Sequence, residues 1–390
     1  MRIALGSERL LATSALDGRR VGVVCNPASV DHDLVHIADR LTAHPRVRLT
    51  AIFGPQHGFR SDAQENMIET AHARDDKHRV PVYSLYSDTR EPTADMLRDV
   101  DVLVIDLQDV GTRIYTYIYT MAYCLMAARR QQVKVIVCDR PNPIGGIDTE
   151  GPMLVTGFES FVGLYPVPMR HGMTIGELAR LFNEHFAIGA DLEVVTMQGW
   201  RREMYLDDAG APWVMPSPNM PTLDTALVYP GTVLFEGTNV SEGRGTTRPF
   251  ELVGAPWVVA EPFTEALNRQ SAGLIAGVVF RPVVFEPTFH KHAKQPCAGC
   301  QIHVVDRGQF RPVLTTVLLL QAFRRAGPDR FAWRDPPYEY EHEKLPFDIL
   351  AGSSQLRQQI EADMGAEEIA RRWEPAVAEF QAIRRHFLLY

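Results

Sequence analysis

The chain has 390 residues, of which 45% are hydrophobic and 23% charged, an ordinary globular composition. Its length predicts two domains, and its formal net charge of −8 argues against a nucleic-acid partner. No run approaches the roughly 20 apolar residues of a membrane span, and the N-terminus has no apolar stretch of signal-peptide length. Five sparse cysteines, three of them in apolar runs, favour a reducing compartment. We therefore expect a cytoplasmic protein with no membrane contact.

Short apolar runs alternate with amphipathic stretches through the first half of the chain. Continuous apolar strands separated by helices indicate a parallel sheet with helices on both faces, an α/β, Rossmann-like architecture. In chain order, strands are expected at 21–25, 49–53, 80–86, 102–106 and 134–139, and helices at 34–41, 93–98 and 115–130.

Four of these strands end in polar, turn-forming sequence, and ligands of parallel sheets bind beyond the carboxyl ends of the strands. The first strand ends in Asn26, and three others end in GPQHGF (54–59), DLQDVGTR (106–113) and DRPNPIGG (139–146). The glycine-rich turn of a dinucleotide site is missing after the first strand, as are the P-loop, GxSxG and HExxH patterns. These absences argue against nicotinamide chemistry, phosphoryl transfer and simple serine hydrolysis.

A further helix at 174–186, with Thr174 and Glu177 in capping-box positions, precedes a strand at 192–197. The pattern then becomes α+β. Helices are expected at 263–269, 312–325, 354–363, 366–371 and 375–387, and strands at 278–285 and 301–306. We predict a Rossmann-like domain over 1–255 and a smaller α+β domain over 256–390.

The segment 229–251, YPGTVLFEGTNVSEGRGTTRPFE, concentrates acids, arginines and hydroxyls between four glycines. A core element could not bury so many charges without partners, so we expect an ordered polar loop at a site. The alternative interpretation is an ordinary surface loop whose charged residues form ion pairs and no functional site. A second candidate, His290 to His303 with Cys297-x-x-Cys300, lacks the second spaced pair of a strong zinc site, so no metal is predicted.

The remaining polar residues at strand ends are carboxylates, arginines, amides and aromatic rings, an inventory that suits a sugar. Glycoside hydrolysis needs two carboxyl groups, and an arginine can bind a ligand carboxylate through two hydrogen bonds. Taken singly, each acid is more often an ion-pair or turn residue. Their joint occurrence at strand ends is what favours a site.

Seven segments together resemble the exo-acting β-N-acetylmuramidases, the NamZ-like family. They are FGPQHGF (53–59), DLQDVGTRIYTY (106–117), DRPNPIGG (139–146), PMRHGMTIGELA (168–179), PSPNMPT (216–222), the segment 229–251, and YEYEHEKLPFDILAGS (338–353). The resemblance spans about residues 5 to 388. It implies two domains with the active site in a cleft between them, no cofactor, and release of N-acetylmuramic acid from the non-reducing end of peptidoglycan fragments in cell-wall recycling.

One position departs from the family pattern, which typically reads GPEHG with the Glu as a leading catalytic candidate. Here that position is Gln56, and an amide cannot act as a general acid. The acid could come from Glu65, Glu69, Glu236 or Glu242. The protein could instead act on another glycoside, or bind a sugar without cleaving it. His57 is a further candidate proton donor because histidine titrates near neutral pH.

The resemblance and the polar inventory together predict a site for an amino sugar or muropeptide, with Glu236 or Glu242 as general acid and Arg244 or Arg248 on the lactyl carboxylate. The oligomeric state is left open. The catalytic candidates are Glu236, Glu242, Asp106, Asp109 and His57. The candidate substrate-binding residues are Gln56, Arg113, Tyr115, Tyr117, Arg140, Asn142, Asn219, Asn239, Arg244, Arg248 and Glu251.

Overall fold

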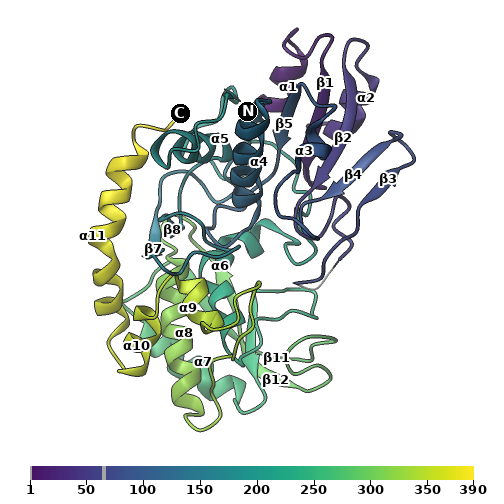
Figure 1. Ribbon diagram of the computed structural model, residues 1–390. Helices are drawn as coiled ribbons and strands as arrows, with labels where there is room; N and C mark the ends of the chain where they lie inside the picture. The colour runs from purple at the N-terminus through teal and green to yellow at the C-terminus, as the bar shows by residue number, and fades with distance from the viewer. Residues whose placement is uncertain (1, 64–66) are drawn as a thin grey trace.

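A seven-stranded sheet organises the first half of the computed structural model, which describes residues 2–63 and 67–390 (Figure 1). Its strand order is β3-β4-β2-β1-β5-β6-β9, and all neighbours are parallel except the β3–β4 pair. The strands are β1 (Arg20–Cys25), β2 (Arg48–Gly54), β3 (Ala73–Asp75), β4 (Val80–Ser84), β5 (Val102–Asp106), β6 (Lys134–Cys138) and β9 (Leu192–Val195). The predicted α/β architecture is confirmed.

Helices cover both faces of this sheet because successive strand residues point to opposite sides. Val23 packs in one core with residues of α1 and α2, whereas Val24 packs in the other with residues of α3, α4 and α5. The helices are α1 (Gly6–Leu11), α2 (Ile37–Ala43), α3 (Ala94–Leu97), α4 (Tyr117–Gln131) and α5 (Ile175–Arg180), which continues as the π-helical turn η1 (Leu181–His185). The predicted capping box of Thr174 and Glu177 is present at the start of α5.

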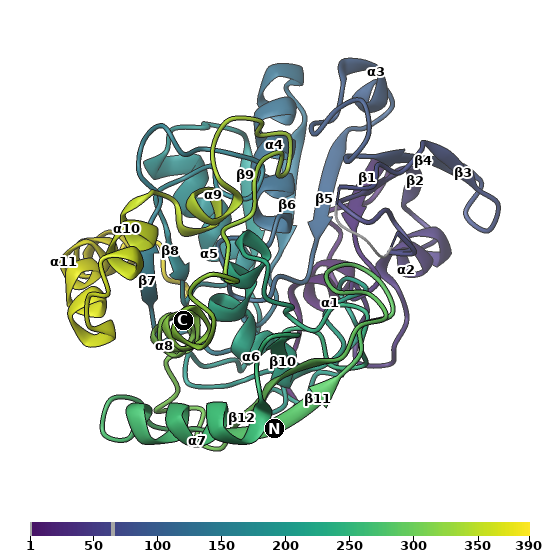
Figure 2. The same ribbon diagram turned by 90° about the horizontal axis from the view of Figure 1, so that it is seen from below.

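A smaller antiparallel sheet, order β10-β12-β11, lies apart from the large one with helices packed against it (Figure 1). The antiparallel pair of strands β7 and β8 lies between the two regions, with α11 packed against β7 on its outer side (Figure 2). The elements are β7 (Glu150–Met153), β8 (Pro168–Arg170), α6 (Leu223–Thr232), η2 (Val233–Gly237), β10 (Leu252–Ala255), α7 (Ala260–Ser271), β11 (Val278–Phe285), β12 (Cys297–Val304), α8 (Pro312–Ala326), α9 (Pro346–Ala351), α10 (Gln355–Glu361) and α11 (Ala366–Arg384). No helix among the described residues is long and apolar enough to cross a membrane.

Two of the expectations for residues 256–390 were wrong. The closing helices at 366–371 and 375–387 are one helix, α11, which continues through Pro375. Its buried face, including Trp373, Val377 and Phe380, packs as a unit, and this packing outweighs the lost backbone hydrogen bond. The strand expected at 301–306 instead begins at Cys297, where Gly299 lets β12 approach β10 closely: an added Cβ would lie 2.1 Å from the Val253 carbonyl oxygen.

The segment 229–251 is only partly a loop. Its first residues are helical, because the apolar side chains from Tyr229 to Phe235 are buried as the end of α6 and as η2. The helix α6 contacts the start of α8 at Gly231, where an added Cβ would lie 2.0 Å from the Pro312 carbonyl oxygen. This close approach fixes η2, which carries Glu236. The polar loop proper begins after Gly237.

Candidate active site

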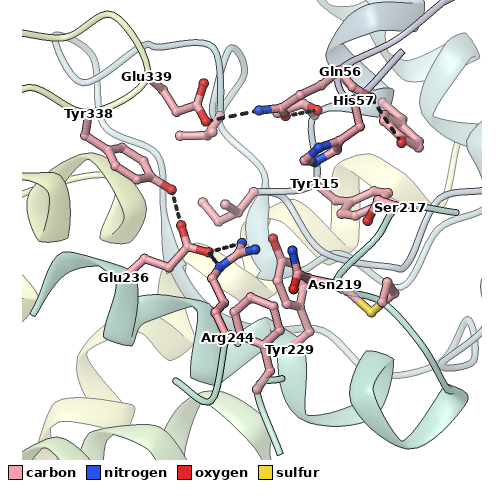
Figure 3. A pocket seen from close by; sticks show the side chains of 16 residues that line it. Gln56, His57, Tyr115, Ser217, Asn219, Tyr229, Glu236, Arg244, Tyr338 and Glu339 are labelled. Atoms are coloured by element: carbon pink, nitrogen blue, oxygen red, sulfur yellow. Dashed lines mark hydrogen bonds and ion pairs between the residues drawn. The ribbon is translucent and has the colours of Figure 1, made fainter. Parts of the chain in front are cut away.

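One partly open pocket, with about 460 Å³ of space including the solvent at its mouth, collects residues from both regions (Figure 3). It receives the turn after β2, the start of α4, the segment before α6, the α6–η2 junction, the polar loop and the segment before α9. Its lining residues are Gln56, His57, Ile114, Tyr115, Thr116, Tyr117, Val162, Ser217, Asn219, Met220, Tyr229, Glu236, Arg244, Phe250, Tyr338 and Glu339.

Glu339 is the carboxylic acid that faces Gln56 in this pocket. The Gln56 Nε2 donates to Glu339 Oε1 at 3.1 Å, and the Tyr86 hydroxyl donates to Oε2 at 2.8 Å. Thr116 Oγ1 donates to Gln56 Oε1 at 2.8 Å, which fixes the orientation of the amide. Burial, and secondarily the nearby Glu236 carboxylate, raise the pKa of Glu339 to about 7 against those hydrogen bonds. A carboxyl group with that pKa carries a proton near neutral pH and can donate it.

A strained two-residue turn presents this acid. Tyr338 and Glu341 exchange both backbone hydrogen bonds at 2.9 Å, and the residues between them, Glu339 and Tyr340, have φ of 45° and 68°. Positive φ at both central positions is the pattern of a type I′ turn, which favours Asn-Gly. Non-glycine residues adopt such backbone at a cost of about 1 kcal/mol or more each, and such strain clusters at functional sites.

Glu236 supplies the second carboxyl group of the pocket, held in a charged hydrogen-bonded arrangement. Arg244 donates to Glu236 Oε1 from Nη2 at 2.5 Å and from Nε at 3.2 Å. The Tyr338 hydroxyl donates to Glu236 Oε2 at 2.6 Å (Figure 3). Since Arg244 also faces Phe250 at 4.9 Å, its guanidinium plane is fixed. The hydrogen bonds to Glu236 engage Nε and Nη2, so Nη1 is available to an anionic ligand group.

His57 lines the pocket in its neutral form. Burial lowers its pKa to about 4, and Nδ1 lies 2.7 Å from the Ala63 carbonyl oxygen. That contact requires the proton on Nδ1, so Nε2 is an acceptor. At neutral pH, therefore, His57 can accept a hydrogen bond at Nε2, but with this pKa it is neither a proton donor nor a strong base.

Aromatic rings form one wall of the pocket. Tyr115 packs edge-on against Tyr117, with ring centroids 4.7 Å apart, and against Tyr229 at 6.1 Å. Tyr229 in turn packs against Phe250 at 4.8 Å. Asn219 lies beside this wall (Figure 3). Ring faces with amides and a fixed arginine are surfaces on which a sugar ring binds.

The acids at the strand ends lie outside this pocket. Asp106, at the end of β5, forms a buried bidentate ion pair with Arg140, whose Nε and Nη2 lie 2.5 and 3.0 Å from its oxygens. Asp109 accepts from the Gly111 backbone N–H at 2.7 Å and contacts His171 at 3.2 Å. Both carboxylates thus shape the loops at the edge of the sheet.

Arginines and amides of the predicted site also hold backbone. The fully buried Arg113 donates to the carbonyl oxygens of Pro152, Val167 and Leu350 at 2.7 to 2.9 Å. Asn142 bonds the backbone of Ile144 and Met173, and Asn239 bonds that of Arg330 and Ala332.

Of the charged residues in the segment 229–251, Glu236 on η2 and Arg244 in the polar loop line the pocket. Glu242 is buried beside it in an ion pair with Lys291 at 2.6 Å; although burial acts against this, Lys291 with His290 and Arg244 holds the pKa of Glu242 well below its usual range. Arg248 pairs with Glu251 at 3.1 Å, and Glu251 also accepts from Thr222 and Thr225.

Two other glutamates, Glu65 and Glu69, were candidates for the general acid because Gln56 cannot donate a proton. Glu69 is exposed and contacts Tyr340 and Arg90, and Glu65 lies outside the described residues. The sequence reasoning did not single out Glu339, Tyr338 or Tyr229. A usable signal was the segment 338–343, YEYEHE, in which acids alternate with rings within a stretch already matched to the family.

The cysteines of the weighed zinc motif, Cys297 and Cys300, are buried in β12. Across residues 2–63 and 67–390, no group of three or more His, Cys, Asp or Glu side chains is arranged to hold a metal ion. The residues of the pocket likewise form no such cluster.

An α/β scaffold with two carboxyl groups in one polar pocket, one of them with a pKa raised to about 7, is the arrangement of a glycoside hydrolase. Comparisons with known proteins specify it further. The model of the N-terminal region of exo-β-N-acetylmuramidase NamZ matches residues 21–224, and that of its C-terminal region matches residues 227–390. The chain belongs to the exo-β-N-acetylmuramidase NamZ family.

Individual relatives agree with this membership. The chain is 47% identical over 391 residues to the peptidoglycan β-N-acetylmuramidase NamZ of Bacillus subtilis (strain 168), covering all of this chain and 92% of the relative. It also resembles two crystal structures of DUF1343 family proteins from Bacteroides fragilis NCTC 9343. One has a TM-score of 0.89 at 35% identity and the other 0.76 at 26%, each covering 100% of this chain and 99% of the solved chain.

Proposed function

We propose that this protein is an exo-acting β-N-acetylmuramidase, a glycoside hydrolase that releases N-acetylmuramic acid from the non-reducing end of peptidoglycan fragments. Family membership over the whole chain supports the reaction class. The observation that carries the proposal is Glu339, a buried carboxylic acid with a pKa of about 7 in the pocket that also holds Glu236 and Arg244.

Arg244 gives the pocket its selectivity for a muramyl sugar. N-acetylmuramic acid differs from N-acetylglucosamine by an ether-linked lactyl group that ends in a carboxylate. The buried guanidinium of Arg244 is held in place by Glu236 and Phe250, and its Nη1 can donate to that carboxylate. Hydrogen bonds between ionised partners are roughly twice as strong as neutral ones, so the lactyl carboxylate is the group by which the pocket recognises the sugar.

Glu339 is the general acid in this proposal, in place of the Glu236 or Glu242 predicted from the sequence. As the bond between C1 and the leaving oxygen breaks, the Glu339 proton passes to that oxygen. Glu236 is the second carboxylate, which stabilises positive charge developing at the sugar ring. Water supplies the hydroxyl group that C1 gains, and the proton that this water loses restores the protonated form of Glu339.

Gln56 is a positioning residue in this scheme. Its amide accepts from Thr116 and donates to Glu339, so it orients the acid without exchanging a proton. The Gln at this position is therefore compatible with hydrolysis. A protein that binds a sugar without cleaving it would need no protonatable carboxyl group at this place.

The compartment and physiological role are part of the same proposal. All five cysteines are buried and free, which fits a reducing cytoplasm. Release of a single amino sugar there fits cell-wall recycling. Cell fractionation with an antibody tests the location, and accumulation of uncleaved muropeptide fragments in a deletion strain tests the role.

The decisive experiment is turnover of a chromogenic β-N-acetylmuramide by the purified protein beside the matching β-N-acetylglucosaminide. We expect turnover of the muramide and at most weak turnover of the glucosaminide. If saturable binding of N-acetylmuramic acid is measured calorimetrically while neither substrate is cleaved, the protein is a binding protein and the proposal is wrong.

A further inference from the structure

A second, open hollow with about 1160 Å³ of empty volume adjoins the pocket and shares Glu339 with it. We call it the outer groove. It is lined by Glu69, Ser87, Asp88, Thr89, Arg90, Tyr123, Glu159, Ser160, Phe161, Leu164, Glu339, Tyr340 and Glu341. Among the described residues, Glu339 is the one that lines both hollows, so the acid stands at the boundary between them.

The position of Glu339 between the two hollows is the position that a glycosidase requires of its general acid. The general acid protonates the oxygen that joins the released sugar to the leaving group, and so it must lie between the two binding sites. The pocket on one side of Glu339 holds Arg244, which fits the carboxylate of the released sugar. The open groove on the other side of Glu339 is therefore where the leaving group lies.

Tyr340 supplies a ring face in the outer groove. It follows Glu339 in the strained turn, and 47% of its surface is exposed, an unusual state for a large ring. Arg90 stacks on it, with the guanidinium carbon 4.2 Å from the ring centroid, and also lies 4.6 Å from the ring of Tyr86. This stack orients Tyr340 in the groove that Phe161 and Tyr123 also line, as a platform for an apolar ring face.

The charge of the outer groove selects a neutral occupant. Besides Glu339, its described lining residues include four acids and a single arginine, Arg90. Arg90 is engaged by the Ser87 carbonyl oxygen and lies 3.5 Å from Glu69. A carboxylate placed there would meet like charge, whereas an uncharged hexosamine ring would not.

We propose that the outer groove is the leaving-group subsite and that it binds a neutral N-acetylglucosamine ring against Tyr340. This inference rests on the proposed function. It goes beyond it in assigning a second binding site, its occupant and the residue that recognises the occupant.

The test compares two substrates that share the released sugar. The disaccharide N-acetylmuramyl-β-1,4-N-acetylglucosamine fills both sites, whereas β-N-acetylmuramyl fluoride has a single atom as its leaving group. Tyr340→Ala should lower kcat/KM for the disaccharide about tenfold, which corresponds to about 1.4 kcal/mol, and leave that for the fluoride unchanged. Tyr340→Phe, which keeps the ring and loses only the hydroxyl contact with Glu69, is the matched control and should retain both activities.

A second variant controls for the possibility that Tyr340→Ala displaces the neighbouring Glu339. Tyr123→Ala removes a groove residue carried by α4, away from the turn, and should also affect only the disaccharide. An equal loss on both substrates in Tyr340→Ala, with none in Tyr123→Ala, would overturn the subsite, and so would unchanged disaccharide kinetics in both variants. If the wild type cleaves neither substrate, the proposed function itself fails and the subsite with it.

Discussion

Replacing Glu339 with Gln tests the central chemical claim. The amide has the shape of the carboxyl group, so its oxygen can still accept from Gln56 and its nitrogen can donate to Tyr86. The pocket therefore stays folded, but the residue can no longer transfer a proton. General acid catalysis contributes typically 10²- to 10⁴-fold, so we expect kcat to fall by about that factor, or about 3 to 5 kcal/mol in activation free energy.

The pH dependence supplies a second readout. Because the acid must be protonated and its pKa is about 7, wild-type activity should fall as pH rises through about 7. Glu339→Gln has no such group, so its residual activity should lack this alkaline limb.

At alkaline pH, Glu339→Gln should raise the stability of the folded protein although it lowers activity. The ordinary pKa of 4.5 applies to the unfolded chain, and the folded value is about 7, so the folded protein binds the extra proton between these pH values. Stability from Glu339 is then fully present below about pH 4.5 and is lost as pH rises through about 7. The difference corresponds to about 3 kcal/mol at pH 8, and Glu339→Gln should be more stable there by up to that amount.

The assay is steady-state hydrolysis of the chromogenic muramide from pH 5 to 9, paired with urea unfolding at pH 4.5 and 8. A variant that keeps more than a tenth of wild-type kcat with an unchanged alkaline limb would refute Glu339 as the acid. Glu236→Gln is the matched comparison, since it also removes a carboxylate from the pocket but should keep an alkaline limb in any residual activity, moved to lower pH because the Glu236 charge no longer raises the pKa of Glu339.

Three further perturbations probe the surroundings of this acid. Gln56→Glu would put a second carboxyl group about 3.1 Å from Glu339, so the pair would share a proton; the alkaline limb should move to higher pH, and an unmoved limb would contradict the contact. Arg244→Lys keeps the charge but loses the planar donor group, so KM for the muramide should rise about tenfold with little change for the glucosaminide, and equal changes on both would remove Arg244 from the lactyl site. Lys291→Met removes the nearest cation of the buried Glu242, which should cost about 3 kcal/mol in urea unfolding at pH 7, and a loss below 1 kcal/mol would show that the other cations suffice.

The large sheet could be predicted from sequence because its strands are buried on both faces. Short, unbroken apolar runs such as 21–25 and 102–106 are typical of such strands, and they ended within a residue or two of the observed ones. Pro375 misled the prediction, because local propensity ends a helix where tertiary packing continues it.

The site could be predicted only where its residues are close in sequence. The sequence predicted that acids and arginines of the segment 229–251 converge, and Glu236 and Arg244, eight residues apart, are joined by hydrogen bonds. Glu339 lies 283 residues from Gln56, so no local pattern announces their contact. Asp106 and Arg140 were predicted as site residues because they follow strand ends. In the structure they form a buried ion pair with each other outside the pocket.

The buried arginine at position 113 has a mechanical consequence. Its guanidinium ties β7, the approach to β8, and α9 through the carbonyl oxygens of Pro152, Val167 and Leu350. A hinge motion between these elements would strip three acceptors from one buried cation, a cost too large to recur on every catalytic cycle. The scaffold around the pocket is thus rigid before substrate arrives, and small-angle scattering should show the same molecular dimensions with and without bound sugar.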